Sequence, residues 1–316
     1  MIYRPINKLV LFAIFISVAV GAFGQKKDDK AEMTGTPVMW EKVDTSSLDL
    51  YAGPGGDALK PDLSSITFIS EEKGGHSQKF KIKDGAGHTW VAKIGDEAQS
   101  ETAAVRLVWA LGYKSEINYL VPTLTIPGKG TFNNVRLEAR GDGIKRLETW
   151  SWKDNPFQGH KEFQGLKIMM AFLNNWDMKE ANNVILKNGD QLQYVISDLG
   201  VSFGKTGGNG LPLFWRIGRS RNVPDQYVES DFVKEVKSGK IKFEFNGKNM
   251  PLLNDITKAD GRWLADLLLQ LTNKQIEDAF RAANYSDADV AILSKGVRDR
   301  IKALDLATQD SMAATN

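Results

Sequence analysis

The stretch spanning residues 174–204 constrains the fold of this chain more than any other part of its sequence. Two short apolar runs, residues 184–186 and 194–196, flank a polar turn at residues 188–190. Apolar runs separated by such a turn are typical of a β-hairpin. The sequence therefore predicts a loop, a strand, a tight turn and a second strand in this stretch.

Polar side chains stand at the open end of this expected hairpin. Asp177 and Asn182 precede the first strand, and Asp198 follows the second strand within the string Ser-Asp-Leu-Gly. Because antiparallel strands bring the start of one beside the end of the other, we expect these side chains to converge. Carboxylate and amide oxygens suit a Mg²⁺ ion that is held against phosphates.

The order of these residues resembles that of protein kinases. Asp177 and Asn182 look like the D-x-x-x-x-N of the kinase catalytic loop, and Asp198-Leu199-Gly200 looks like D-F-G with leucine in place of phenylalanine. The chain is more similar to the atypical branch, which includes phosphoinositide-kinase-like and HipA-like proteins, and to a group of secreted bacterial proteins with this pattern. The resemblance implies an α+β, bilobal, kinase-like fold with a small β-rich N-lobe and a larger, mainly helical C-lobe.

Upstream of this stretch, three segments have the alternation and residue types of β-strands: residues 66–69, 80–83 and 89–94. The loop between the first two segments carries Gly74, Gly75 and Ser77. Backbone N–H groups in a glycine turn can bind phosphate, so these residues are candidate nucleotide contacts. The loop departs from the kinase pattern G-x-G-x-x-G, and an ordinary hairpin turn is the alternative interpretation.

A lysine and a glutamate extend the resemblance. Lys93 lies in the string Val-Ala-Lys-Ile, which resembles the V-A-I-K of kinases, whose lysine holds the nucleotide phosphates. Apolar spacing predicts a helix over residues 97–113, and its Glu101 resembles the kinase glutamate that pairs with this lysine. The separation of eight residues from Lys93 is shorter than in most kinases. The alternatives are a solvent-exposed strand lysine and a glutamate that only stabilises the helix N-terminus.

The resemblance implies a chemical role for each polar residue around the hairpin. Asn182 and Asp198 would bind Mg²⁺ or Mn²⁺, with the neighbouring Asn183 as an alternative ligand. Asp177 would accept or position the proton of the attacking hydroxyl, and Lys179 would neutralise charge on the transferred phosphoryl group. The donor would be ATP or another nucleotide, and the acceptor is unknown.

A basic cluster of Arg216, Arg219 and Arg221 follows the hairpin. It either meets an anionic substrate or forms a solvated face. Two alternatives to an exported phosphotransferase also stay open: a pseudokinase that binds a ligand or a protein without catalysis, and a structural protein of the cell envelope. In the second alternative the Asp and Asn residues would only make loop hydrogen bonds.

The N-terminus and the composition favour export. Residues 1–24 combine a positive start, an apolar run and small residues before Gln25, which is the pattern of a secretory signal peptide. We therefore expect a periplasmic or extracellular protein without a stable membrane anchor after cleavage, and an uncleaved anchor is the alternative. A net charge of +2 gives no reason to expect nucleic acid as a partner, and the lack of cysteine excludes disulfides and thiolate metal sites.

The remaining segments complete the expected organisation: a flexible N-terminal lead-in over residues 25–60, an N-lobe over 61–126, a C-lobe over 127–306 and a polar tail over 307–316. Val121-Pro122 is expected to mark the passage between the lobes. Thr272 and Gln275 have the spacing of a capping box at the start of a helix. A break is expected near Gly296 in the last helix.

Overall fold

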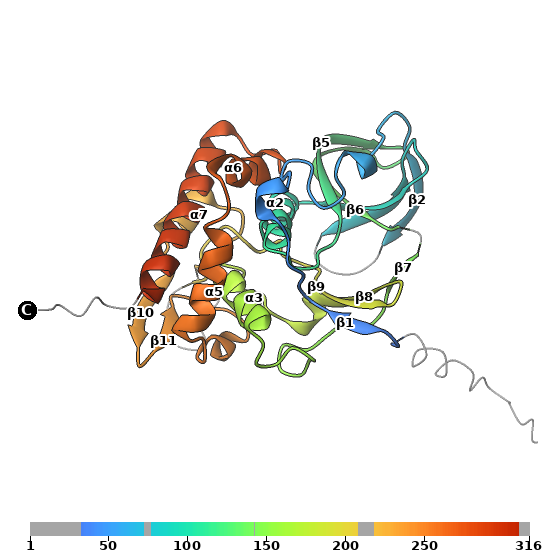
Figure 1. Cartoon of the computed structure of the whole chain (residues 1–316). Helices are drawn as coiled ribbons and strands as arrows, with labels where there is room; N and C mark the ends of the chain where they lie inside the picture. Colours follow the sequence, from blue (N-terminus) through green and yellow to red (C-terminus); the bar gives the residue numbers. More distant parts are fainter. Residues whose placement is uncertain (1–32, 73–76, 142, 208–217, 310–316) are drawn as a thin grey trace, which may run out of the picture.

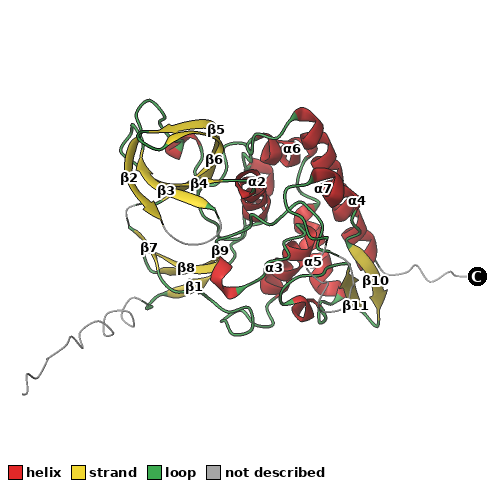
Figure 2. Cartoon of the chain, turned by 180° about the vertical axis from the view of Figure 1, so that it is seen from behind, coloured by secondary structure: helices red, strands yellow, loops and turns green. Residues whose placement is uncertain are grey.

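The computed structural model describes residues 33–72, 77–141, 143–207 and 218–309, and it has the two-part layout expected from the sequence (Figure 1). A β-rich lobe packs beside a larger lobe that is mainly helical, and both are also seen from behind in Figure 2. The predicted α+β class with two lobes is therefore confirmed. The N-lobe contains β2 (Thr67–Glu72), β3 (Gln78–Lys83), β4 (Thr89–Ile94), α2 (Glu97–Ala110), β5 (Asn118–Ile126) and β6 (Gly130–Ala139).

The strands of the N-lobe form an antiparallel sheet in the order β2-β3-β4-β6-β5. Alternate side chains such as Phe80, Trp90 and Leu137 point into the hydrophobic core of this lobe. The intervening positions face the other way, and the register places Lys93 of β4 opposite Arg136 of β6. This second face therefore carries charged side chains toward α2.

The passage between the lobes lies later in the chain than the sequence indicated. Val121 and Pro122 sit within β5, where Val121 pairs with Val135 of β6, so both strands belong to the N-lobe. Pro122 has no backbone N–H to donate. It is tolerated because β5 is an edge strand with a neighbour on one side only, so no hydrogen bond to a second strand is lost. The chain leaves this sheet after Ala139 and enters a second sheet at β7 (Ile144–Arg146).

The predicted hairpin forms the middle of the second sheet. β8 (Asn183–Asn188) and β9 (Gln191–Ile196) pair as antiparallel neighbours around the turn, which confirms the hairpin. The strand order of this sheet is β1-β9-β8-β7. Val184 and Val195 belong to a small apolar cluster on one face, whereas Ile185 joins the main core of the C-lobe.

The N-terminal lead-in is packed against the rest of the protein from residue 33 onward, which corrects the flexible segment expected over residues 25–60. β1 (Thr36–Val38) joins the second sheet as a parallel partner of β9. Met39 and Leu50 are buried in the main core, so burial of apolar surface holds the segment in place. Two short 3₁₀ helices follow β1: η1 (Thr45–Ser47) and η2 (Asp57–Leu59).

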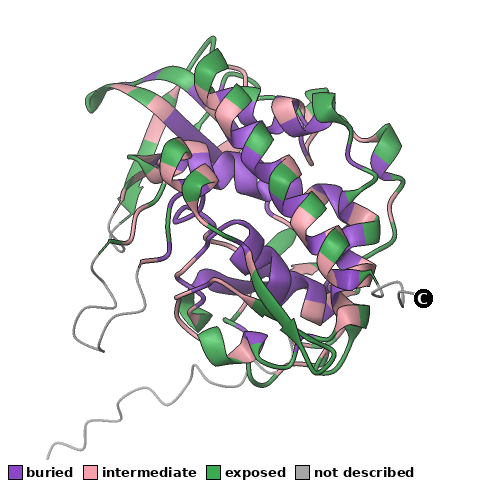
Figure 3. Cartoon of the chain, turned by 90° about the vertical axis from the view of Figure 1, so that its left-hand side faces the viewer, coloured by how far each residue is buried: buried purple, intermediate pink, exposed green. Residues whose placement is uncertain are grey.

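The helices of the C-lobe pack around one core, and buried and exposed residues alternate along them as expected for helices with one buried face (Figure 3). This lobe contains α3 (Lys161–Phe172), η3 (Glu180–Asn182), α4 (Pro224–Glu229), β10 (Val233–Lys237), β11 (Lys240–Phe243), η4 (Met250–Leu253), α5 (Lys258–Leu268), α6 (Asn273–Arg281) and α7 (Asp287–Thr308). The capping box predicted for Thr272 and Gln275 is confirmed at the start of α6. The break expected near Gly296 is wrong, because α7 runs through that buried glycine, which packs against Tyr227.

Among the residues that the structure describes, no helix is both long enough and apolar enough to span a membrane. The expected signal peptide over residues 1–24 and the tail residues 310–316 lie outside the described residues. Export therefore stays a prediction from the sequence.

Candidate functional site

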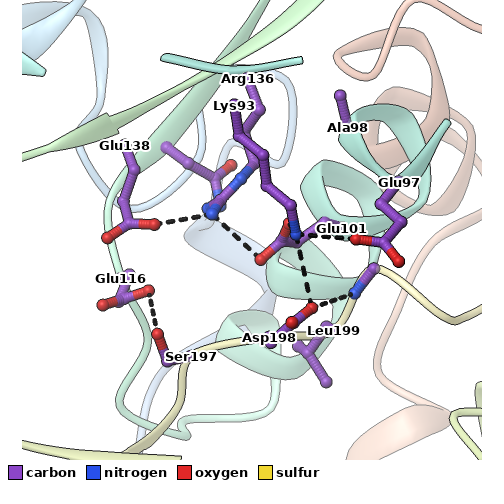
Figure 4. Close-up of polar contacts among 12 residues, drawn as sticks. Lys93, Glu97, Ala98, Glu101, Glu116, Arg136, Glu138, Ser197, Asp198 and Leu199 are labelled. Atoms are coloured by element: carbon purple, nitrogen blue, oxygen red, sulfur yellow. Dashed lines mark hydrogen bonds and ion pairs between the residues drawn. The ribbon is translucent and has the colours of Figure 1, made fainter. Parts of the chain in front are cut away.

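Lys93 lies at the centre of a cluster of carboxylates between the two lobes (Figure 4). It is only 4% exposed, which excludes the solvent-exposed strand lysine considered from the sequence. Its Nζ atom is 2.9 Å from Oε2 of Glu101, 3.0 Å from Oε2 of Glu97 and 3.6 Å from Oδ1 of Asp198. The predicted pairing of Lys93 with Glu101 is therefore confirmed.

The electrostatics of this cluster favour the charged forms of Lys93 and Asp198. Burial alone would lower the pKa of Lys93, but the carboxylates of Glu101 and Asp198 outweigh it and raise the pKa above the ordinary lysine value. Burial alone would raise the pKa of Asp198, but Lys93 and the backbone N–H of Gly200 outweigh it and lower the pKa. Lys93 and Asp198 are thus ionised together at neutral pH.

Glu97 is a second carboxylate at this lysine, and the sequence analysis missed it. Its Oε2 atom accepts a 3.3 Å hydrogen bond from Oγ of Ser77, and its Oε1 atom lies 2.7 Å from Nη1 of Arg221. The spacing of four residues from Lys93 is visible in the sequence. Only the fold shows that the first turn of α2 comes back over the end of β4.

Arg136 links this cluster to the next strand of the sheet. Its Nη2 atom lies 3.1 Å from Oε1 of Glu101 and 2.6 Å from Oε2 of Glu138. The sequence analysis missed Arg136 because it places this segment in the C-lobe. Strand alternation is the signal that would have found it, since Arg136 faces Lys93 directly across the sheet.

The Asp-Leu-Gly string is fixed from both sides. Oγ of Ser100 in α2 donates a 2.6 Å hydrogen bond to the carbonyl oxygen of Gly200. A Cβ atom at Gly200 would lie 2.7 Å from Cβ of Glu97, so this close approach requires glycine. The backbone N–H of Asp198 donates to the carbonyl oxygen of Asn182 at 3.3 Å. These contacts place Asp198 beside both the segment that carries Lys93 and the hairpin.

Asp177 is held between two lysines at the start of the hairpin. Its Oδ2 atom is 2.7 Å from Nζ of Lys179, and its Oδ1 atom is 2.6 Å from Nζ of Lys248. Nδ2 of Asn182 donates to the Asp177 carbonyl at 2.9 Å and to Oδ2 at 3.3 Å. Burial alone would raise the pKa of Asp177, but the two ammonium groups outweigh it and lower the pKa. The sequence analysis missed Lys248, because the loop after β11 carries no local signal for this contact.

Other predicted residues lie outside this cluster. Gly74, Gly75 and Arg216 lie outside the described residues. The guanidinium carbon of Arg219 sits 5.0 Å from the ring centre of Trp176, and its Nη2 atom donates to the carbonyl oxygen of Asn246 at 3.0 Å, so this half-buried arginine is held within the C-lobe. Of the two arginines of the basic cluster that the structure describes, Arg221 contacts Glu97 and so reaches the lysine site.

The predicted oxygen donors for a metal are those of Asn182 and Asp198, with Asn183 as the alternative. The Nδ2 atom of Asn183 donates to the carbonyl oxygen of Trp150 at 2.9 Å, and its Oδ1 atom is buried without a hydrogen-bond partner among the described residues. Among the described residues, no three or more His, Cys, Asp or Glu side chains are grouped so that they could hold a metal ion. Mg²⁺ is commonly bound through one or two protein carboxylates together with substrate phosphates. The residues therefore fit a metal that binds together with a nucleotide, and they do not fit a stand-alone metal site.

The chain matches no protein-family model and no curated protein. Among solved structures, it is similar to the Helicobacter pylori proinflammatory kinase CtkA, with 12% identity and a TM-score of 0.49 over 78% of this chain and 98% of that chain. It is also similar to the Golgi casein kinase with Mn/ADP bound, with 9% identity and a TM-score of 0.38 over 81% of this chain and 75% of that chain. The Rio2 kinase-ADP/Mg²⁺-phosphoaspartate complex from Chaetomium thermophilum has 11% identity and a TM-score of 0.31 over 78% of this chain and 74% of that chain. At these values the geometry around Lys93, and not the likeness, carries the functional argument.

Proposed function

We propose that this protein is a kinase-like phosphotransferase that binds a nucleotide and a divalent metal between its two lobes. One observation carries the proposal: a buried lysine of the N-lobe sheet pairs at 2.9 Å with a helix glutamate and lies 3.6 Å from the aspartate that follows the hairpin. Burying the charge of a lysine costs free energy unless the lysine is paired with carboxylates. Here the pairing joins segments from both lobes. The same pairing is the one that orients nucleotide phosphates in kinases.

The residues of the chain divide the work of phosphoryl transfer. Lys93, placed by Glu101, would orient the phosphates of ATP or another nucleotide. Asn182 and Asp198 would hold Mg²⁺ or Mn²⁺, which neutralises phosphate charge when it is bound. Lys179 would stabilise the charge of the transferred phosphoryl group.

Asp177 would position the acceptor more than it would deprotonate it. In the transfer, the bond from the γ-phosphorus to the bridging oxygen breaks and leaves its electron pair on the diphosphate. The acceptor oxygen forms the new bond to phosphorus, and its proton passes to the Asp177 carboxylate or to water. Because the two ammonium groups lower the pKa of Asp177, its carboxylate is a weak base but a well-placed hydrogen-bond acceptor.

The test is the thermal stability of the mature protein, from Gln25 onward, with Mg²⁺ or Mn²⁺ and ATP. A ligand present at 100 times its Kd stabilises the native state by about 2.7 kcal/mol, so we expect the Tm to rise by several degrees. Asp198→Asn should lose this rise, and neither the metal alone nor ATP alone should reproduce it. Asp190→Asn, which changes an exposed aspartate in the hairpin turn, is the matched control and should keep it. No rise at millimolar nucleotide in the unchanged protein would reject nucleotide binding.

A pseudokinase is the second candidate, and the carboxylates that already pair with Lys93 favour it. Glu97 and Glu101 both lie within 3.0 Å of the ammonium group, so phosphates must compete with Glu97. This alternative predicts a metal-dependent rise in Tm without any transfer of phosphate. Incubation with γ-labelled ATP separates the two, because only a phosphotransferase releases labelled phosphate or labels itself, and Asp177→Asn should suppress that signal.

We also propose that the protein is exported and acts in the periplasm or outside the cell. The support is the charge and hydropathy pattern of residues 1–24. Mass spectrometry of the secreted or periplasmic form should find Gln25 at the N-terminus. Recovery of the intact Met1 form from the cytoplasm alone would reject export.

A further inference from the structure

A cavity of about 620 Å³ lies next to the Lys93 site but is built from other residues. Trp109 near the end of α2, Leu186 of β8 and Ile144 of β7 are among its apolar lining residues. The described residues that form the proposed phosphate and metal site, such as Lys93 and Asp198, do not line it. Its volume falls within the range of small-molecule pockets, which is roughly 300–1,000 Å³.

The N-terminal lead-in holds one wall of this cavity in place. The backbone N–H of Glu41 donates to the carbonyl oxygen of Gly112 at 2.9 Å, and the backbone N–H of Lys114 donates to the carbonyl oxygen of Met39 at 2.9 Å. Gly112 has a φ of +92°, and a Cβ atom there would lie 2.1 Å from the Glu41 carbonyl oxygen. Because backbone bonds and a required glycine fix the wall, the cavity is formed before any ligand binds.

Arginine side chains are concentrated on one side of the cavity. Arg140, Arg146 and Glu116 line it. Arg146 pairs with Glu116, and both arginines pair with Glu138, with a distance of 3.3 Å between Nη1 of Arg146 and Oε1 of Glu138. Glu138 has a third guanidinium partner, Arg136, at 2.6 Å. Three guanidinium groups therefore lie together on this side of the molecule, each paired with at least one carboxylate, and Arg136 also pairs with Glu101. Lys114 and Glu41 also line the cavity, and their charges neutralise each other at a distance of 2.7 Å.

Donors without partners lie in and beside the cavity. The Ser115 hydroxyl is buried, and it has no hydrogen-bond partner among the described residues, although Ser115 lines the cavity. Nε and Nη1 of Arg136 are likewise buried without a hydrogen-bond partner in the described part of the chain. A buried polar group without a partner is unfavourable, so an acceptor in the cavity that bonds to the Ser115 hydroxyl would recover free energy.

We propose that this cavity binds a small organic anion that carries an apolar ring or chain. A carboxylate or sulfonate group would accept hydrogen bonds from Arg140, Arg146 and Ser115, and the apolar part would pack on Trp109 and Ile144. This inference does not rest on phosphoryl transfer. It adds a second ligand site that touches the first, since Nη2 of Arg146 also donates a 2.9 Å hydrogen bond to Oγ of Ser197, the residue before Asp198.

The test uses two fluorescent probes with the same ring system and the protein from Gln25 onward. 8-Anilinonaphthalene-1-sulfonate carries a negative charge, and N-phenyl-1-naphthylamine is its neutral counterpart. We expect one equivalent of the sulfonate to bind with enhanced fluorescence. Arg140→Gln should weaken binding of the sulfonate at least tenfold and of the neutral probe less than twofold. Ile144→Trp should abolish binding of both, because the larger side chain fills the cavity.

Arg281→Gln is the control, because it removes one arginine of an exposed ion pair on α6, away from the cavity lining. It should leave both affinities unchanged. Unchanged sulfonate binding in Arg140→Gln, equal loss of both probes in that variant, or no binding by the unchanged protein would each overturn the proposal. Circular dichroism establishes that each variant is folded. If Ile144→Trp does not fold, the ratio of the two affinities in Arg140→Gln decides, because that side chain is partly exposed.

Discussion

At the scale of single residues, the site is defined by how one ammonium group is shared. Lys93 has three N–H donors, and three carboxylates lie within 3.6 Å of its Nζ atom. Glu101 and Asp198 are the partners that the kinase resemblance implies. Glu97 is an additional partner, and Arg221 holds it from the other side at 2.7 Å. A phosphate that binds Lys93 must therefore displace Glu97.

Glu97→Gln should raise the affinity for Mg²⁺-ATP by about two- to fivefold. The substitution removes the negative charge that competes with phosphate for Lys93, and this change in affinity corresponds to about 0.4–1 kcal/mol. Isothermal titration measures the affinity, and Glu101→Gln is the matched comparison, which should lower it because Lys93 then loses its positioning partner. A lower affinity in Glu97→Gln would mean that Glu97 helps to hold the nucleotide instead of competing with it.

Asp177 should make the stability of the protein depend on pH in the acid range. Its folded-state pKa is lowered by Lys179 and Lys248, so it stabilises the native state above the ordinary aspartate pKa of about 3.9. This contribution is lost as the pH falls through the lowered pKa. Urea unfolding from pH 7 to pH 2 should show that the stability advantage over Asp177→Asn shrinks below about pH 4. Lys248→Met should reduce the advantage, and an advantage that is constant with pH would contradict the pairing.

At the scale of elements, close packing of α3 against its neighbours fixes the segment that leads to Asp177. Gly165 lies in the middle of this helix, where glycine costs roughly 0.5–1 kcal/mol relative to alanine. A Cβ atom at this position would lie 2.4 Å from the Trp263 ring and 2.6 Å from the Tyr113 hydroxyl. Contact with neighbouring elements therefore decides the residue here against helix propensity.

Gly165→Ala should destabilise the protein by about 1–2 kcal/mol. The overpacking cost of roughly 1–3 kcal/mol exceeds the gain in helix propensity. Gly296→Ala in α7 is the comparison, because its nearest side-chain atoms lie at 3.0 Å and its loss should be smaller. Urea denaturation measures both values. Equal or higher stability of Gly165→Ala would show that Trp263 moves aside without cost.

At the scale of the whole molecule, a polar network joins the lobes beside the candidate site. Arg146 of β7 pairs with Glu116 before β5, with Glu138 of β6 and with Ser197 after β9. Ser197 in turn donates a 3.0 Å hydrogen bond to Glu116. The network crosses from the N-lobe sheet to the second sheet next to Asp198, and Figure 4 shows its hydrogen bond between Ser197 and Glu116.

Arg146→Ala should lower the unfolding free energy by about 1–3 kcal/mol and should reduce the Tm rise produced by Mg²⁺-ATP. It leaves the buried Glu116 with one fewer partner, and the cost stays below that of a fully buried pair because Arg146 is partly exposed. Arg262→Ala removes a similarly exposed arginine that pairs with Asp266 and Asp305 within the C-lobe. It should cost stability but leave the nucleotide effect intact. An equal nucleotide effect in both variants would show that Arg146 does not couple the lobes to the site.

The sequence by itself determined the elements whose signals are local. The hairpin around residues 184–196 follows from two apolar runs and a turn, and Thr272 with Gln275 marks the start of α6. The pairing of Lys93 with Glu101 was implied by the resemblance to kinases, and the two side chains are 2.9 Å apart in the structure. Such signals are readable because alternation, capping and turn geometry depend on neighbouring residues.

Only the tertiary structure decided which distant groups complete the site. Lys248 and Arg221 reach the site from separate segments, and no periodicity in the sequence encodes contacts between such segments. The lobe boundary was misplaced at Pro122 for the same reason. Whether a proline interrupts a sheet depends on whether its strand lies at the edge of that sheet, and the sequence does not show this. Long-range pairing is set by the free energy of burying whole faces together, and that balance exists only in the folded chain.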